Sequence, residues 1–307
     1  MTLNTGSSHQ RWSRRGFLAS AGVAAVGAIS VAVDEGVLPG RSFLYAKLGL
    51  DGPDGEIPNV EPGRSVSGSF VSQARGGLRT GWTIAMPPGV RPGTRALPVA
   101  VVLHGRGSDH NAAFTDYLAL DRFLAAAVGQ GATPFAMASV DGGESYWHGR
   151  STGDNAGAMV VEEFLPLLAD HGLDVSRVAF VGWSMGGFGS LHLAGQLGRD
   201  RVVAAAVMSP ALWHHFEDST TGAFDDAADF ERVTVFGRQR ELDGIPLRID
   251  CGEEDPFYPA DRDYVESFPA RPAGVFEPGS HDVGYWRRMA PAQVRFIADA
   301  FASSPQA

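Results

Sequence analysis

One apolar run ending in a glycine-rich turn, residues 178–187, constrains this chain more than any other stretch. It reads Val-Ala-Phe-Val-Gly-Trp-Ser-Met-Gly-Gly. The apolar residues from Val178 to Val181 fit a strand buried on both faces, and the apolar positions after Ser184 fit a helix packed back onto that strand. Strand, sharp turn and helix is the context of a nucleophile elbow, G-x-S-x-G, in which small neighbours permit strained backbone angles. Ser184 is therefore a candidate nucleophile. The alternative is an incidental serine in a glycine-rich connection.

Composition limits the partners and the chemistry. The chain has 307 residues, is 44% hydrophobic and carries a formal net charge of −10. Only Arg11, Arg14 and Arg15 are charged before Asp34, so the remainder is more acidic still. An acidic surface repels phosphate backbones, and we expect no nucleic-acid partner. The single cysteine, Cys251, excludes an internal disulfide and the cysteine-rich zinc motifs.

Residues 1–33 resemble an export signal. A Ser-Arg-Arg-Gly-Phe-Leu segment starts at Ser13, and an uncharged apolar stretch follows from Phe17 to Val33. This pattern is similar to a twin-arginine signal. The alternative is a single membrane-spanning helix, although the stretch lies at the short end of the roughly 17–25 residues that spanning needs. We expect an exported protein, secreted or in the cell envelope, whose N-terminal segment is either a signal or a membrane anchor.

The rest of the chain predicts a linker followed by one α/β domain. Residues 34–63 are rich in Gly, Pro and charge without a sustained period, which indicates a linker or N-terminal arm. Residues 64–303 form the predicted domain. It begins with a hairpin of strands 65–74 and 79–86, the antiparallel edge, and continues with strands that alternate with helical patterns. That alternation is typical of a mainly parallel sheet with helices on both faces.

The expected elements after the hairpin are strands at 98–103, 135–140, 178–181, 202–208, 246–251 and 273–277. The expected helices are 112–128, 154–171 and 291–302, and Pro166 should kink or break the second of them. Residues 210–243 are rich in acidic and aromatic residues and do not fit the alternation. They are the candidate for a cap or a substrate-binding insertion.

A serine nucleophile needs a base within reach and an acid that orients the base. In proteins with this elbow the chain order is Ser, acid, His, and such residues follow the carboxyl ends of strands. Asp255 fits the acid, because Asp-Pro at a turn fixes the side chain near the strand end; Glu253 and Glu254 compete but are expected to be solvated. His281 fits the base, because it lies in a glycine-flanked loop after the last predicted strand.

Two backbone amides should face the oxyanion that forms when a serine attacks a carbonyl group. The amide of Met185, directly after the serine, is one candidate. The amide of Arg106, within His104-Gly-Arg-Gly107 after the 98–103 strand, is the other. A plain glycine-rich turn between a strand and a helix is the alternative for this second loop.

Aromatic residues near the expected rim of the site are candidates for binding the acyl or alcohol part of a substrate: Trp147, Trp183, Trp213 and Trp286. Filling the core or covering the cap is an equally good interpretation of each. We expect no metal, because adjacent His214 and His215 point in different directions and suggest no third ligand. We expect no nucleotide cofactor either, because neither G-x-x-x-x-G-K-[ST] nor G-x-G-x-x-G occurs.

Taken together, these motifs resemble the esterase family of α/β-hydrolases that includes esterase D, feruloyl esterase domains and mycolyltransferases. The resemblance runs from about residue 65 to residue 301. Besides the candidates above, it rests on Asp141-Gly-Gly with Ser145-Tyr-Trp, Glu162-Glu-Phe-Leu-Pro166, Cys251-Gly252, and Gly279-Ser-His281 followed by Tyr285-Trp286.

The resemblance implies an α/β-hydrolase fold, a triad of Ser184, Asp255 and His281, and acyl-ester chemistry on a small-molecule or cell-envelope ester. Mycolyltransferases pass the acyl group to a sugar hydroxyl, but they carry an acidic residue where this chain has His104. We therefore expect an exported serine hydrolase that cleaves carboxylic esters. Acyl transfer to a carbohydrate or lipid alcohol and a non-catalytic binding protein on the same fold are the alternatives.

Overall fold

The structure is a computed structural model that describes residues 1, 49, 51–90 and 96–304. The predicted export signal and most of the predicted linker lie outside these residues. The chain divides into two units, residues 1–51 and 52–307, and the fold below is that of the second. Within the described ranges, no helix combines the length and the apolar character that a membrane crossing requires.

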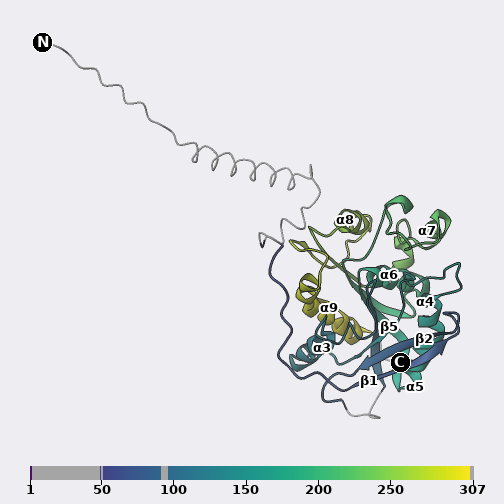
Figure 1. The fold of residues 1–307 in the computed structure, drawn as a ribbon. Coiled ribbons are helices and arrows are strands. Elements are labelled where there is room, and N and C mark those ends of the chain that lie inside the picture. The colour runs from purple at the N-terminus through teal and green to yellow at the C-terminus, as the bar shows by residue number, and fades with distance from the viewer. Residues whose placement is uncertain (2–48, 50, 91–95, 305–307) are drawn as a thin grey trace. The chain divides into compact units, whose positions relative to one another are not determined.

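An eight-stranded sheet forms the centre of this unit, in the order β1-β2-β4-β3-β5-β6-β7-β8 (Figure 1). The pairs β1–β2 and β2–β4 are antiparallel, and all the others are parallel. The α/β fold with an antiparallel N-terminal edge is therefore confirmed. The strands are β1 (Ser65–Ser72), β2 (Leu78–Ala85), β3 (Leu97–Leu103), β4 (Ala136–Val140), β5 (Leu173–Trp183), β6 (Val202–Met208), β7 (Leu247–Gly252) and β8 (Phe276–Glu277).

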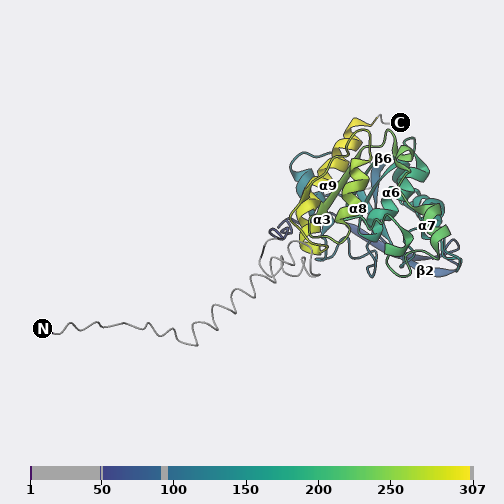
Figure 2. The ribbon, with the colours of Figure 1, turned by 90° about the horizontal axis from the view of Figure 1, so that it is seen from above.

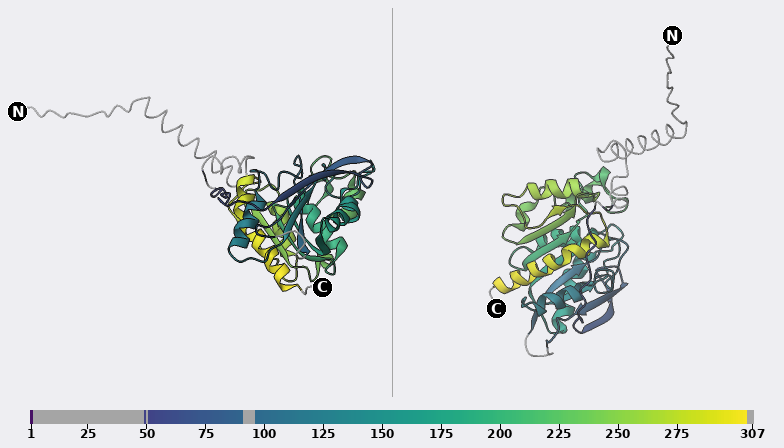
Figure 3. Two further views of the ribbon diagram at one scale, coloured as in Figure 1. Left: turned by 90° about the horizontal axis from the view of Figure 1, so that it is seen from below. Right: turned by 90° about the vertical axis from the view of Figure 1, so that its left-hand side faces the viewer.

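Helices cover both faces of the sheet, with α3 and α9 on one side and α4, α5 and α6 on the other (Figure 3). The longer ones are α3 (Leu120–Gly129), α6 (Met185–Leu197), α8 (Tyr258–Glu266) and α9 (Val283–Ser303). The shorter ones are α4 (Ala156–Ala158), the π-helical η1 (Met159–Phe164), α5 (Leu165–Asp170), the 3₁₀-helical η2 (Phe216–Asp218) and η3 (Gln239–Leu242), and α7 (Ala227–Val233).

The buried strands fill two cores at once. Along β3, Val99, Val101 and Leu103 belong to the core beneath α6, whereas Ala100 and Val102 belong to the core beneath α3 and α9. Successive side chains of a strand point to opposite faces, so a strand covered on both sides needs a continuous apolar run. This requirement explains the continuous apolar runs of β3 and β6.

The helix predicted at 112–128 is shorter than expected and begins at Leu120. Turns occupy residues 110–118, and the carboxylate of Asp109, directly before them, accepts a hydrogen bond from the Asn111 amide, 2.8 Å away. Ala119 then takes a left-handed φ of 53°, which ends any helical run. The turn-forming hydrogen bonds of Asp and Asn therefore determine the structure of this segment, although its apolar periodicity predicts a helix.

The helix predicted at 154–171 is a continuous helical run over residues 156–170, in which α4 passes into the π-helical η1 and then into α5, so Pro166 marks a change of helix type and not a break. Proline has no N–H to donate, so the helical hydrogen-bond ladder lacks a donor at this point. The π-helical turn before it also places Glu163 toward the hairpin. Oε1 of Glu163 accepts hydrogen bonds from the amides of Gln73 (2.8 Å) and Ala74 (3.0 Å), and its Oε2 accepts one from the Ser72 hydroxyl.

The end of the chain departs from prediction in two places. The strand expected at 273–277 is reduced to Phe276–Glu277, with an isolated bridge between Arg248 and Ala273, because Gly274 has a φ of 131° that interrupts the extended backbone. The last helix begins at Val283 and not at Pro291, which lies inside it. The Asp282 carboxylate caps this helix by accepting from the Tyr285 amide, 2.9 Å away.

We expect Glu163→Ala to lower the free energy of unfolding by about 1–2 kcal/mol, since two amides and a hydroxyl lose their charged acceptor. Glu162→Ala is the matched control: this neighbour is exposed, and its removal should change stability by no more than about 0.5 kcal/mol. Urea denaturation of both variants measures the difference. Equal shifts in the two variants would contradict the role of Glu163.

Candidate active site

Ser184 lies on a sharp turn between the end of β5 and the start of α6. Its backbone angles, φ 54° and ψ −122°, fall in a region that non-glycine residues rarely occupy. The turn tolerates no bulk. A Cβ on Gly186 would lie 1.9 Å from the carbonyl oxygen of Leu103, and one on Gly182 would lie 2.2 Å from the carbonyl oxygen of Gly186. The strand, turn and helix predicted around the serine are all present.

The structure brings Ser184, His281 and Asp255 together from loops after three different strands. Nε2 of His281 lies 3.0 Å from the Ser184 hydroxyl oxygen, and Nδ1 lies 2.8 Å from Oδ2 of Asp255. A carboxylate only accepts hydrogen bonds, so Nδ1 carries the proton and Nε2 is free to accept the serine proton. This is the arrangement that a general base needs.

The acid and the base are both fixed by their surroundings. The Asp255 side chain has no exposed surface, and its other oxygen, Oδ1, accepts a hydrogen bond from the amide of Phe257 at 2.9 Å. The imidazole of His281 contacts the ring of Phe257 on one side and that of Trp286 on another, each with ring centres 5.1 Å apart. Neither side chain is free to turn away from the serine.

The neighbouring glutamates do not compete for His281. Glu253 is partly exposed. Glu254 was expected to be solvated, but it is 5% exposed, and its Oε2 accepts a hydrogen bond from the amide of Gly279 at 2.8 Å. The expectation of a solvated Glu254 is therefore wrong, because the loop that carries the histidine folds over it.

The two amides predicted for the oxyanion lie beside the serine. Met185 is the first residue of α6, and the first amides of a helix have no partner within the helix. The amide of Arg106 donates no hydrogen bond to any of the described residues. Its loop approaches Ser184 closely, since a Cβ on Gly105 would lie 3.3 Å from Cβ of Ser184. Both amides are thus available to an oxygen next to Ser184.

The side chain of His104 holds the loop that contains Gly105 and Arg106 in place. Nε2 of His104 accepts a hydrogen bond from the amide of Gly142 (2.9 Å), so its proton must be on Nδ1, which donates to the carbonyl oxygen of Gly105 (2.8 Å). Burial lowers the pKa of His104, in agreement with a neutral ring. The histidine therefore ties the Gly105–Arg106 loop to the loop after β4.

Two of the four tryptophans predicted to bind substrate are core residues. Trp147 is 0% exposed and Trp183 is 1% exposed. Trp147 packs against Gly189 of α6, where an added Cβ would lie 2.4 Å from the indole. Trp183 belongs to the core beneath α3 and α9. The core interpretation is therefore the right one for these two, and a substrate contact is wrong in this structure because no surface is left.

The other two tryptophans lie close to the site. Trp286 is buried, donates a hydrogen bond from Nε1 to the Ser209 hydroxyl at 3.2 Å, and contacts the His281 ring. Trp213 is at the edge of burial and packs edge-on against Phe257, which itself contacts His281. Trp286 supports the histidine, whereas a substrate contact by Trp213 stays a prediction.

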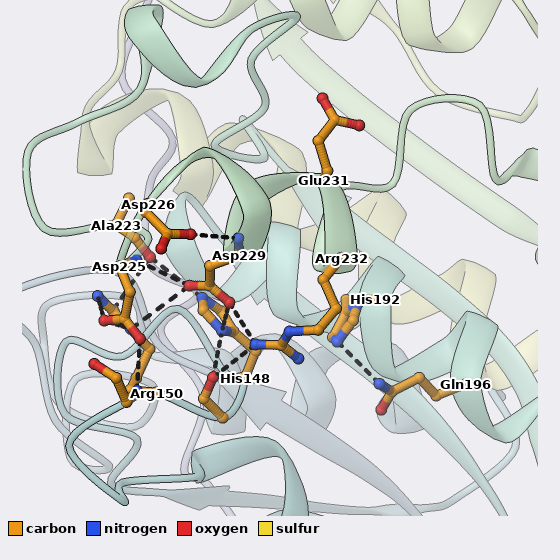
Figure 4. Close-up of polar contacts among 12 residues, drawn as sticks. His148, Arg150, His192, Gln196, Ala223, Asp225, Asp226, Asp229, Glu231 and Arg232 are labelled. Atoms are coloured by element: carbon orange, nitrogen blue, oxygen red, sulfur yellow. Dashed lines mark hydrogen bonds and ion pairs between the residues drawn. The ribbon is translucent and has the colours of Figure 1, made fainter.

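The segment 210–243 lies beside α6 and contains η2, α7 and η3 (Figure 2). Its apolar residues, such as Phe224 and Phe230, join the core beneath α6. It is fastened to the loop after β4, where Nη2 of Arg150 lies 2.9 Å from Oδ1 of Asp225. Asp229, which is on α7, lies between side chains of that loop and another side chain of its own helix (Figure 4). The cap role of this segment stays a prediction.

Two cavities open elsewhere. One of about 640 Å³ adjoins the first residues of β3 and β5, Leu97 and Leu173, and one of about 340 Å³ adjoins the first residue of β7, Leu247. Ser184 lies at the opposite edge of the sheet, where the parallel strands end. Among the described residues, no group of three or more His, Cys, Asp or Glu side chains is placed to hold a metal ion.

Residues 75–296 match the model of the Esterase family, whose description is "Putative esterase". The chain belongs to this family. Its enzyme class is accordingly that of a serine carboxylic-ester hydrolase, and the predicted family is confirmed. No curated protein matches the sequence of this esterase.

Solved structures of esterases share the fold. A ferulic acid esterase is similar over 80% of this chain and 100% of its own, with a TM-score of 0.67 and 18% identity. An S-formylglutathione hydrolase from Agrobacterium tumefaciens is similar over 79% of this chain and 97% of its own (TM-score 0.65, 15% identity). FphF, a fluorophosphonate-binding serine hydrolase of Staphylococcus aureus, is similar over 78% and 99% (TM-score 0.60, 20% identity).

Sequence reasoning missed the residues that support the site. The side chains of His104 and Glu254 each join two loops, and a single sequence does not show that those loops meet. Phe257 belongs to no motif in the sequence, yet its amide and ring touch Asp255 and His281 respectively. The only usable signal was their position, directly after buried strands.

A buried histidine on α6 should make the fold sensitive to acid. The Gln196 amide donates to Nε2 of His192 (3.1 Å), and burial lowers the pKa of His192 to about 4. An unfolded histidine titrates near 6.5, so this contribution to stability is present above that pH and is lost as the pH falls toward 4. The buried, neutral rings of His104 and His148 act in the same sense.

We expect the wild-type free energy of unfolding to fall between pH 7.5 and pH 5, with about 2 kcal/mol of the fall due to His192. His192→Gln, which does not titrate, should remove that part, whereas His215→Gln, an exposed control, should leave the fall unchanged. Urea denaturation at the two pH values gives both numbers. A fall of wild-type size in His192→Gln would contradict the assignment.

Proposed function

We propose that the chain is an exported serine hydrolase that cleaves carboxylic esters through an acyl-Ser184 intermediate. The observation that carries the proposal is the continuous hydrogen-bonded chain from Ser184 through His281 to Asp255, with the serine on a strained elbow. A structural serine needs neither the strain nor the base. Binding alone, the non-catalytic alternative, gives no reason for either feature.

In the first half-reaction the Ser184 hydroxyl oxygen attacks the ester carbonyl carbon while Nε2 of His281 takes its proton. Asp255 holds the imidazole in the correct tautomer and stabilises the imidazolium that forms. The amides of Met185 and Arg106 donate to the oxyanion of the tetrahedral intermediate. His281 then gives its proton to the leaving alcohol oxygen, the carbon–oxygen bond breaks, and the acyl group remains on Ser184.

In the second half-reaction a water molecule replaces the alcohol. His281 takes a proton from the water, whose oxygen bonds to the acyl carbon, and the same two amides receive the oxyanion again. The bond to the Ser184 oxygen breaks, the proton returns to that oxygen, and a carboxylic acid leaves. Acyl transfer would use an alcohol in place of water at this step. Hydrolysis is the proposed reaction, because the chain belongs to an esterase family.

The substrate we propose is a small-molecule or cell-envelope carboxylic ester. The family supports the ester, and the twin-arginine-like segment supports a place outside the cytoplasm, secreted or anchored at the membrane through the N-terminal apolar stretch. The acidic chain supports the absence of a nucleic-acid partner.

The nucleophile is tested with a fluorophosphonate probe and a short-chain aryl ester. We expect the wild-type protein to be labelled and Ser184→Ala to be unlabelled, with kcat/KM lower by about 10⁴-fold or more. Ser190→Ala, a buried serine on the same helix, is the control and should be labelled like the wild type. A wild-type protein that neither takes the label nor hydrolyses the ester would overturn the proposed function.

Export is tested by replacing Arg14 and Arg15 together with lysine. Twin-arginine signals are recognised through the arginine pair, so we expect the double variant to stay in the cytoplasm of a bacterial host that exports the wild type. Arg11→Lys, outside the pair, is the control. Fractionation followed by the ester assay measures the distribution, and equal export of the double variant would refute a twin-arginine route.

A further inference from the structure

Glu254 connects the loop that carries the acid to the loop that carries the base. Its amide donates a hydrogen bond to the carbonyl oxygen of Gly279 (3.0 Å), and its carboxylate Oε2 accepts one from the amide of the same glycine (2.8 Å). The side chain is 5% exposed. Gly279 is two residues before His281, and Glu254 directly precedes Asp255. One residue thus closes a reciprocal pair of hydrogen bonds between the two loops.

The sheet itself gives this region little support. Strand β8 contains only Phe276 and Glu277, and its last contact with the acid loop is the hydrogen bond from the Glu253 amide to the Glu277 carbonyl oxygen, 2.9 Å long. Beyond that point the chain leaves the sheet and turns toward the serine. The two hydrogen bonds of Glu254 are the next contacts along this path.

A second set of hydrogen bonds holds the loop that carries His281, from the side of α9. Nη2 of Arg288, on α9, donates to the carbonyl oxygen of Pro278, and Nη1 donates to that of Pro53 at 2.8 Å. The arginine therefore fixes the start of the loop. Glu254 is the side chain that fixes Gly279, the residue closer to the histidine.

The close packing at this point leaves no room for adjustment. A Cβ on Gly252 would lie 2.1 Å from the carbonyl oxygen of Gly279, so the acid and base loops touch through their backbones. The imidazole of His281 must at the same time meet Asp255 at 2.8 Å and Ser184 at 3.0 Å. A shift of about 1 Å in the histidine loop would break one of these contacts, and a misplacement of that size can cost about 10²-fold in rate.

We propose that Glu254 is a positioning residue, whose buried carboxylate holds Gly279 so that His281 spans the gap between Asp255 and Ser184. It acts through the loop and does not touch the imidazole. Its Oε2 already accepts from Gly279, and Asp255 occupies Nδ1 of the histidine. The proposal rests on the proposed triad, but it assigns a role that the triad itself does not include.

If Glu254 acts through its hydrogen bond to Gly279, Glu254→Gln should be more active than Glu254→Asp. If it acted only through its charge, the order of the two variants would be reversed. Glu254→Gln keeps the length of the side chain and an oxygen that accepts from Gly279, but it removes the charge. Glu254→Asp keeps the charge, but it is one methylene shorter and does not reach Gly279 unless the loop moves. Glu254→Ala removes both the charge and the acceptor.

We therefore measure kcat and KM for a short-chain aryl ester, the pH dependence of kcat/KM, and thermal unfolding for each variant. Glu254→Gln should keep kcat within about threefold of the wild type, whereas Glu254→Asp and Glu254→Ala should lose about 10–100-fold in kcat with little change in KM. Glu253→Gln, at the partly exposed neighbour, is the matched control and should be unchanged.

The outcomes decide between the roles. Wild-type kcat in Glu254→Asp, or equal losses in Glu254→Gln and Glu254→Asp, would overturn the proposal. A shifted acid limb of the pH profile in Glu254→Gln together with lost kcat would assign an electrostatic role instead, and overturn it as well. If Glu254→Ala does not fold, the comparison of Gln with Asp carries the test. Failure of the triad is distinct, because the wild type itself would then be inactive and unlabelled.

Discussion

The whole site depends on one strained residue at the end of β5. Ser184 keeps its unfavourable backbone angles because the structure holds its peptide groups from several sides: its amide donates to the Met208 carbonyl oxygen (3.1 Å), and its carbonyl oxygen accepts from the amides of Gly187 (2.9 Å) and Ala211 (3.0 Å). Strain of this kind, which costs of order 1–3 kcal/mol, persists only where neighbours over-determine the conformation. Ser184 is therefore held by the packing of β5, β6 and α6 together.

The order of the strands explains why the three polar residues meet. Strands β5, β7 and β8 are parallel, so the loops that follow them emerge at the same edge of the sheet. The loops cover the remaining distance between the three residues. Strand β6 lies between β5, which precedes Ser184, and β7, which precedes Asp255. The loop that carries His281 crosses back over the loop that carries Asp255. That crossing needs its own support, because β8 is too short to provide it, and Glu254 and Arg288 supply it from two sides.

The sequence was most informative where burial dictates composition. Strands covered on both faces need apolar runs, so β3, β6 and the second half of β5 were recognisable, and the glycines around Ser184 marked the elbow. Asp255 and His281 followed from chain order and from their place after strands. Two of the failures depend on contacts between distant segments: α6 packs against Trp147, and the histidine loop buries Glu254. The third is local, because the Asp282 cap starts the last helix eight residues before Pro291, which also reads as a helix signal.

His104 has a structural role that an acidic residue at this position would not fill. The position must donate to the carbonyl oxygen of Gly105 on one side and accept from the amide of Gly142 on the other. A neutral imidazole does both, because it has one donor and one acceptor on opposite sides of the ring, whereas an ionised carboxylate only accepts. An acidic residue here would leave the Gly105 carbonyl oxygen without its donor and require a different path for the loop. In this chain the neutral imidazole of His104 therefore determines how the loop that carries the Arg106 amide is built.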